Sequence, residues 1–420
     1  MEGYENSLNV IFTIDVESSR GNVPYLIEGD LSKFGIHNNC GINFIMDTFA
    51  AYDANVVCFV NIFEESLYEN DYMPSLLRRI DRRGNEVALH AHTPPEGGQI
   101  PFYSKCIANC SLEEQKRIFK YGRDYIFKAI GKNPISYRSG AYWTNDYIFK
   151  ALQENGFKVD SSVYYMHKNN HFEKYKNKQN QVFEVDGIIE FPIVVVWNGD
   201  GWRKLDLDSL TEDELVSSFE IMRKSDSYHT VQCMFHSYSF IDNKGNGESV
   251  PILDLNSGRP NHFMIYGEDK KKKEKLKRIL DFLCSSPGYR VLTFEQLLKQ
   301  QVDFSPASED GLLYLKKSNM AFTHDDIDVL YDGNNLFLKN NFKVHGMQYA
   351  WHICSVQSEA KEEYQIDYQP APMSRIKLDD NANGTYNIKS YMKGEDGKRV
   401  GATFFRAIVS KGNVLSVERI

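Results

Sequence analysis

Short apolar runs rich in β-branched residues alternate with helical patterns through the first part of the chain. The runs at 8–14, 55–60 and 86–89 have the length and composition of buried strands. The segments between them, 41–52 and about 76–84, space their apolar residues as a helix does. Repeated β-α units predict a mainly parallel sheet wrapped by helices, so we expect an α/β fold for this part of the chain.

The same alternation continues to about residue 300. It predicts strands at 135–138, 157–160, 188–196, 230–235 and 290–293, and helices near 111–131, 146–155, 212–224, 270–284 and 294–300. The helix at 111–131 opens with a capping box, Ser-Leu-Glu-Glu, and ends at a glycine. In folds of this kind the chemistry lies at the carboxyl ends of the strands, which directs attention to the polar residues that end each run.

The pattern changes after a polar, proline-containing stretch at 301–310, which we interpret as a linker. Beyond it, short alternating strands are separated by turn sequences such as Asp-Gly-Asn-Asn. Within this part, 384–391 alternates as a half-buried strand should. The expected domains are therefore an α/β unit at 1–300 and an all-β, immunoglobulin-like sandwich at 311–420.

The net charge argues against one class of partner. The 420 residues carry a formal net charge of −8, whereas a nucleic-acid-binding surface needs a basic face, so we expect no nucleic-acid partner. The N-terminal Met-Glu-Gly-Tyr-Glu-Asn is acidic, and the apolar run at 8–14 is too short for a signal peptide or a membrane span. We therefore expect a cytoplasmic protein without a membrane-spanning segment.

Two pairs of polar residues at strand ends could hold a metal ion. Asp15 and Glu17 end the first strand, and residues two apart share one side of an extended chain. His90 and His92 end the third strand in the same arrangement, so both imidazoles can reach one divalent ion. Each pair alone has a plain alternative, an acidic strand end or a solvated histidine pair before a turn. Together they form a His₂-carboxylate set with open coordination positions, which suits the activation of water.

Three further strand ends carry residues that could support chemistry. Arg138 can orient a carboxylate and keep it ionised, or it can be a surface arginine at a turn. Asp160 could serve the same site, although an aspartate in this position is commonly a helix N-cap. His236 follows a strongly apolar strand and is a candidate general acid, with a satisfied core histidine as the alternative. Gly140 would let the backbone approach a ligand closely.

Residues 8–300 resemble the polysaccharide deacetylase superfamily, also called carbohydrate esterase family four. Its motifs occur in the family's order, as Phe-Thr-Ile-Asp-Val-Glu at 12–17, Gly-Asn-Glu-Val-Ala-Leu-His at 84–90, Ser-Tyr-Arg-Ser-Gly-Ala-Tyr-Trp at 136–143, Gly-Phe-Lys-Val-Asp-Ser-Ser at 156–162 and Met-Phe-His at 234–236. The resemblance implies a distorted (β/α) barrel of the deacetylase type.

The resemblance also implies catalytic roles. Asp15 would be the base that takes a proton from the attacking water, and His236 would be the acid that protonates the leaving amine. Arg138 would support Asp15, and Asp160 would hold Arg138 in place. The family's Arg-x-Pro-Tyr is Arg-Ser-Gly-Ala in this chain, so the Ala141 N–H would contribute to the oxyanion hole.

The implied metal ligands show one departure from the family pattern. The family spaces its two metal histidines as His-x-x-x-His, but the residue four after His90 is Pro94. The resemblance therefore implies that His92 takes the second histidine position, beside His90 and Glu17. Zinc is the expected ion, and Fe²⁺ or Co²⁺ would also suit these ligands.

The expected function is metal-dependent removal of an N- or O-linked acetyl group from a carbohydrate or glycan precursor. The departure at Pro94 and the added β-sandwich leave a rival open, which is a carbohydrate-binding protein with reduced or no catalysis on the same scaffold. A third interpretation keeps the metal but places a non-sugar amide bond in the site.

Overall fold

The structure is a computed structural model. It describes residues 7–18, 27–29, 39–68, 71–92, 106–164, 167, 169, 180–198, 202–224, 228–242, 267–300, 313–314, 327–340, 348–356, 363–369, 373–393 and 399–419. The chain divides into two compact units, Met1–Val195 with Arg203–Gly311, and Val196–Trp202 with Leu312–Ile420. The predicted linker at 301–310 and Pro94 lie outside the described residues, so the linker stays a prediction.

The first unit is built on one sheet of nine strands, in the order β10-β1-β2-β3-β4-β5-β7-β6, with β13 also paired to β1. The strands are β1 Leu8–Val16, β2 Val57–Asn61, β3 Glu86–Ala91, β4 Ser136–Ser139, β5 Val159–Asp160, β6 Phe183–Val185, β7 Ile188–Glu190, β10 Thr230–His236 and β13 Tyr289–Val291. All neighbouring pairs are parallel except β6 and β7. The predicted α/β architecture with a mainly parallel sheet is confirmed.

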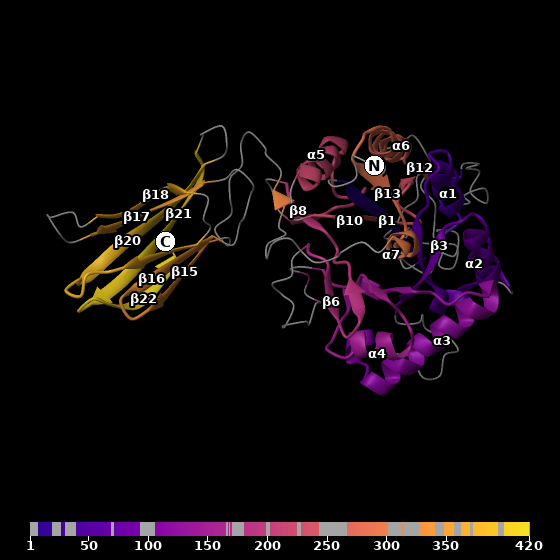
Figure 1. Cartoon of the computed structure of the whole chain (residues 1–420), viewed down its shortest axis with the longest axis horizontal. Helices are drawn as coiled ribbons and strands as arrows, with labels where there is room; N and C mark the ends of the chain where they lie inside the picture. Colours follow the sequence, from indigo (N-terminus) through magenta and orange to yellow (C-terminus); the bar gives the residue numbers. More distant parts are fainter. Residues whose placement is uncertain are drawn as a thin grey trace, which may run out of the picture. The chain divides into compact units, whose positions relative to one another are not determined.

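The helices of this unit lie around the outside of the curled sheet, apart from the short helix α7 (Figure 1). They are α1 Ile42–Ala50, α2 Tyr72–Arg82, α3 Leu112–Ile130, α4 Ile148–Glu154, α5 Glu212–Lys224, α6 Lys270–Ser285 and α7 Phe294–Lys299, with 3₁₀ turns η3 Ile62–Leu67, η4 Ile107–Asn109 and η5 Gly140–Tyr142. The predicted capping box begins α3, since Ser111 and Glu114 accept each other's backbone N–H, and Gly131 ends it at φ +73°.

Isolated backbone hydrogen bonds bring the two ends of the sheet together. Ile193 N donates to Val163 O at 2.8 Å, and Leu205 N donates to Val194 O at 2.8 Å. Met234 N, on β10, donates to Leu205 O at 3.2 Å. The sheet therefore curls towards closure through single bonds rather than through a further regular strand pair, and we call this curled half-barrel the barrel.

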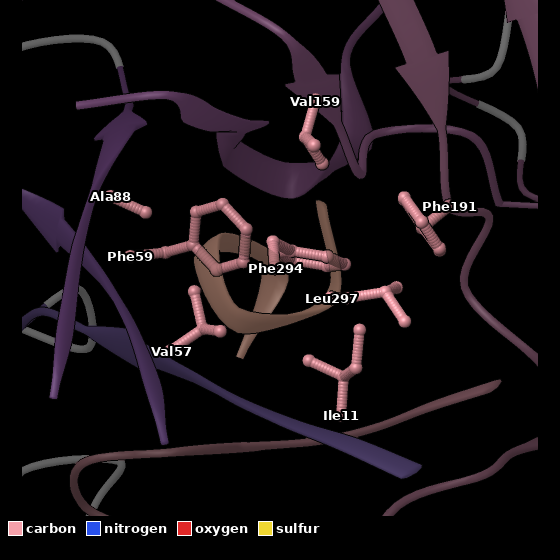
Figure 2. Packing of buried hydrophobic residues seen from close by; sticks show 8 residues of the cluster. All are labelled: Ile11, Val57, Phe59, Ala88, Val159, Phe191, Phe294 and Leu297. Atoms are coloured by element: carbon pink, nitrogen blue, oxygen red, sulfur yellow. The ribbon is translucent and has the colours of Figure 1, made fainter. Parts of the chain in front are cut away.

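The core of the barrel lies beneath the carboxyl ends of the strands. Phe294 and Leu297 of α7 pack against inward-facing strand residues, as Figure 2 shows; these are Ile11, Val57, Phe59, Ala88, Val159 and Phe191. The two α7 residues are fully buried. The helix fills one end of the barrel with apolar side chains and leaves the opposite end for polar groups.

The predicted strand at 188–196 is interrupted. The chain forms β7 as far as Glu190 and resumes at β8, Val195–Trp197. Pro192 lies between them, and proline cannot donate a hydrogen bond to a neighbouring strand. The other short strands are β9 Trp202–Lys204, β11 Ile241–Asp242, β12 Gly267–Glu268 and β14 Leu313–Tyr314.

Most of the second unit is formed by two antiparallel sheets, in the orders β15-β16-β19 and β18-β17-β20-β21-β22, and its β14 pairs in parallel with β8. The strands are β15 Ile327–Asp332, β16 Asn335–Asn340, β17 Gln348–Ser355, β18 Glu363–Gln369, β19 Met373–Lys377, β20 Gly384–Lys393, β21 Arg399–Ser410 and β22 Asn413–Arg419. From Tyr386 to Met392, every second residue of β20 is buried, which confirms the predicted half-buried strand. The described residues of this unit form strands and turns, and the all-β sandwich stays a prediction.

Every helix in the described ranges is too short or too polar to span a lipid bilayer.

Candidate metal centre and active site

Four parallel strands place polar side chains at one end of the barrel. Asp15 of β1 lies opposite His236 of β10, and His90 of β3 lies opposite Arg138 of β4. Because neighbouring strands run the same way, their carboxyl ends meet at a single edge. The residues that the sequence singled out at strand ends are therefore brought together.

The inner face of β1 shows how the sequence produces this end. Ile11, Thr13 and Asp15 are two residues apart and so share a face. Ile11 belongs to the apolar core, Thr13 accepts a hydrogen bond from Arg138, and Asp15 forms an ion pair with the same guanidinium. The face changes from apolar to polar to charged within five residues.

Glu17, His90 and His92 form a cluster that could hold a metal ion. Glu17 Oε2 lies 3.2 Å from His90 Nε2 and 3.0 Å from His92 Nε2, and the three candidate ligand atoms all lie within 4.8 Å of one another. Glu17 and His90 are buried, whereas the His92 side chain is 27% exposed. Three nitrogen and oxygen ligands with one open side are typical of a catalytic zinc site.

The tautomer of His90 also fits a metal ligand. Its Nδ1 lies 2.9 Å from the carbonyl oxygen of Arg138, which can only accept a hydrogen bond, so Nδ1 carries the proton. In the neutral ring, the form that binds a metal ion, the lone pair is then on the buried Nε2, which lies 3.2 Å from Glu17 Oε2. A second hydrogen bond of this kind orients metal-binding histidines in general. The donor set fits Zn²⁺, Fe²⁺ or Co²⁺.

The charge of Glu17 suits the same role. Burial opposes the ionisation of its carboxyl group, but the imidazoles of His92 and His90 outweigh burial and hold the pKa of Glu17 well below its usual range. The carboxylate form is the one that binds a metal ion.

Gly140 makes room for His92. A Cβ atom at Gly140 would lie 2.4 Å from Cγ of the His92 ring, which is far inside van der Waals contact. Glycine is therefore required because an imidazole packs on its backbone. The sequence had suggested a close approach of a ligand to Gly140, and the described structure places a candidate metal ligand there.

Asp15 is held by a buried guanidinium. Arg138 Nη1 donates to Asp15 Oδ1 at 2.6 Å, and Arg138 is fully buried over the Phe59 ring. Burial alone would raise the pKa of Asp15, but the charges of Arg138, His90 and His236 lower it below its usual value. Asp15 is thus ionised beside the candidate metal ligands, with Oδ2 4.0 Å from His90 Nε2.

Arg138 is held by the residues that follow Asp160 rather than by Asp160 itself. Its Nε donates to Ser161 O at 3.1 Å, and its Nη2 donates to Ser161 Oγ at 3.0 Å. Asp160 Oδ1 accepts from Ser161 N at 2.9 Å and from Ser162 Oγ at 2.6 Å. Asp160 therefore acts on Arg138 through this segment.

His236 lies on the other side of the cluster and has a carboxylate partner that the sequence analysis missed. Its Nε2 is 3.9 Å from Glu17 Oε1, and its Nδ1 is 4.0 Å from Asp208 Oδ2. Burial works against the ionisation of Asp208, but the interactions with His236 and Lys272 lower its pKa. The sequence offers one signal, the alternating Leu-Asp-Leu-Asp at 205–208.

The backbone after β4 is strained. Ala141 and Tyr142 are consecutive non-glycine residues in the left-handed region, at φ +50° and φ +58°. Each such residue costs about 1–2 kcal/mol, and outliers of this kind gather at functional sites. Asn169 Nδ2 donates to Ala141 O at 2.8 Å and helps to fix the turn. The predicted oxyanion donor thus lies on a backbone held in an unusual conformation.

Comparisons with known proteins add only distant likenesses. No family model matches the chain, and the search of curated proteins found no match. Among solved structures, the chain is similar to a candidate polysaccharide deacetylase from Mycobacterium smegmatis, at 16% identity and a TM-score of 0.45, over 70% of this chain and 90% of that one. It is also similar to a 4-alpha-glucanotransferase from Thermococcus litoralis, at 17% identity and a TM-score of 0.44, over 74% of this chain and 42% of that one.

A third similar structure is a CE4 family pseudoenzyme from Bacillus anthracis, at 13% identity and a TM-score of 0.36, over 74% of this chain and 70% of that one. At TM-scores this low, similarity establishes neither a shared fold nor a shared function.

Proposed function

We propose that this chain is a metal-dependent hydrolase that removes an acetyl group from a carbohydrate or glycan precursor. The observation that carries the proposal is the Glu17, His90 and His92 cluster, which lies beside an aspartate that Arg138 holds ionised. The motif resemblance to the polysaccharide deacetylases supplies the substrate class. The same geometry also suits an amide or ester that is not part of a sugar, so the experiment compares acetylated sugars with simple acetamides.

A divalent ion held by Glu17, His90 and His92 would polarise the substrate carbonyl and make water a stronger nucleophile near neutral pH. Asp15 accepts the proton that the attacking water loses. Its ion pair with Arg138, at 2.6 Å, keeps it ionised and fixes its orientation.

Two further groups act on the substrate. The Ala141 N–H donates a hydrogen bond to the substrate's carbonyl oxygen, on which negative charge develops during the reaction. His236 returns a proton to the leaving nitrogen or oxygen, and Asp208 on its far side orients the ring. Base and acid lie on neighbouring strands, β1 and β10, in direct register.

The test is acetate release from a panel of acetylated sugars, which includes N-acetylglucosamine oligomers, O-acetylated oligosaccharides and simple acetamides. The wild-type protein should release acetate from at least one of the sugars, and His90→Ala should abolish the release together with metal binding. His229→Ala is the matched control, because His229 is exposed just before β10, away from the carboxyl ends of the strands. Full activity in His90→Ala with metal still bound would contradict the proposal, and so would activity on the acetamides alone.

A further inference from the structure

Two buried carboxyl groups lie side by side behind the candidate active site. Asp160 of β5 and Glu190 of β7 are opposite each other in neighbouring parallel strands, and both are fully buried. Glu190 had no role in the sequence analysis. Buried carboxyl groups are rare unless they are paired or protonated.

The hydrogen bonds of the pair leave one oxygen of each group without a donor. Asp160 Oδ1 accepts from Ser161 and Ser162, and Glu190 Oε1 accepts from Val163 N at 3.0 Å. Asp160 Oδ2 and Glu190 Oε2 are buried and have no hydrogen-bond donor among the described residues. A single proton on one carboxyl group, donated to the other, satisfies both oxygens.

The charges nearby decide which group carries the proton. The charge of Arg138 acts on Asp15, Asp160 and Glu190. If all three carboxyl groups were ionised, three buried negative charges would surround one guanidinium, which burial makes very costly. Asp160 accepts hydrogen bonds from two donors, which favour its ionised form, whereas Glu190 accepts from one. Burial and the charge of Asp160 raise the pKa of Glu190 well above its usual range, which also favours Glu190 as the protonated partner.

We propose that Glu190 is a positioning residue, whose protonated carboxyl group donates a hydrogen bond to Asp160 and thereby fixes the 161–162 segment that holds Arg138 against Asp15. This inference rests on the proposed function for its effect on turnover. The shared proton itself does not depend on that function.

The connection from Glu190 to the site runs through two serines. Ser161 accepts two hydrogen bonds from Arg138, which donates in turn to Asp15. Ser162 Oγ donates to Asp160 and accepts from Ser139 N at 2.9 Å. Ser139 directly precedes Gly140, on which His92 packs. A shift of Asp160 would therefore disturb both the base and a candidate metal ligand.

The test compares two substitutions of Glu190. Glu190→Gln keeps an N–H donor for Asp160 and an oxygen for the Val163 N–H, so its kcat should stay within about threefold of wild type. Glu190→Leu removes the donor, so its kcat should fall about 10- to 100-fold while KM stays unchanged, because the loss is in the positioning of the base. Glu86→Gln is the matched control, since Glu86 is also buried but lies at the opposite end of β3, and its kcat should not change.

Infrared spectroscopy tests the proton directly. At about pH 8, wild type should show the carbonyl-stretch band of a protonated carboxyl group, and Glu190→Gln should lack it. An identical band in the two proteins would overturn the inference, and so would wild-type kcat in Glu190→Leu. If Glu190→Leu does not fold, the presence or absence of the band in Glu190→Gln still shows whether the buried proton depends on Glu190. If no acetylated sugar is hydrolysed, the proposed function has failed, and the band still decides whether Glu190 and Asp160 share a proton.

Discussion

Replacing Gly140 with alanine should weaken metal binding without altering a metal ligand. A Cβ atom at this position lies 2.4 Å from His92 Cγ, 2.6 Å from Cδ2 and 2.7 Å from Nδ1. Ordinary contacts begin near 3.4 Å, so the ring has to move by about 1 Å in a densely packed surrounding. That movement takes His92 Nε2 away from its 3.0 Å approach to Glu17. We expect zinc affinity to fall about 10- to 100-fold, as when the support of a metal ligand is lost.

The assay is competition for zinc between the purified protein and a chromophoric chelator, repeated in a His92→Ala background. In the His92→Ala background, Gly140→Ala should not lower the zinc affinity further, because both substitutions act through the same ring. Circular dichroism of each variant controls for the fold. The reasoning would be refuted if Gly140→Ala had wild-type zinc affinity. It would also be refuted if Gly140→Ala lowered the zinc affinity equally in the wild-type and His92→Ala backgrounds.

Three other substitutions test separate parts of the account. Asp15→Asn should lower kcat about 10²- to 10⁴-fold with the metal still present by elemental analysis, and joint loss of metal and activity would make Asp15 a ligand instead of the base. His236→Ala should lower kcat more on an acetamide than on the matching acetate ester, because an alkoxide leaves with less need of a proton; equal losses would favour a core histidine. Burial raises the pKa of Glu86 to about 7 from 4.5, so the folded protein binds the proton more tightly and the free energy of unfolding falls as pH rises from about 4.5 to 7. Chemical denaturation should show that Glu86→Gln has lost this decrease in the free energy of unfolding, which is at most about 3 kcal/mol. If the pH dependence is the same in Glu86→Gln as in wild type, Glu86 does not cause the decrease.

The strands that carry the site could be predicted because their sequences are unambiguous. The apolar runs at 8–14, 55–60 and 86–89 became β1, β2 and β3, since strands buried on both faces are apolar throughout. The place of α7 could not be predicted in this way. Its six residues predict only an ordinary short helix, and the packing in the folded structure is needed to show that Phe294 and Leu297 fill the barrel.

The candidate site was predictable to the extent that its residues end strands. Asp15, His90 and His236 each follow an apolar run directly, and parallel strands bring such ends together. Asp208 and Glu190 were missed for a physical reason. Asp208 lies in a turn, and the role of Glu190 depends on its register with a strand thirty residues earlier, which no local pattern specifies.

The central claim is that Glu17, His90 and His92 hold a catalytic metal ion, and stoichiometric reconstitution tests it most directly. The protein is stripped with a chelator, its metal content is measured by elemental analysis, and zinc is added back in steps while acetate release is followed. The account predicts an inactive stripped protein whose activity rises linearly and reaches its maximum at about one zinc ion per chain. Full activity in protein shown to be free of metal would contradict it.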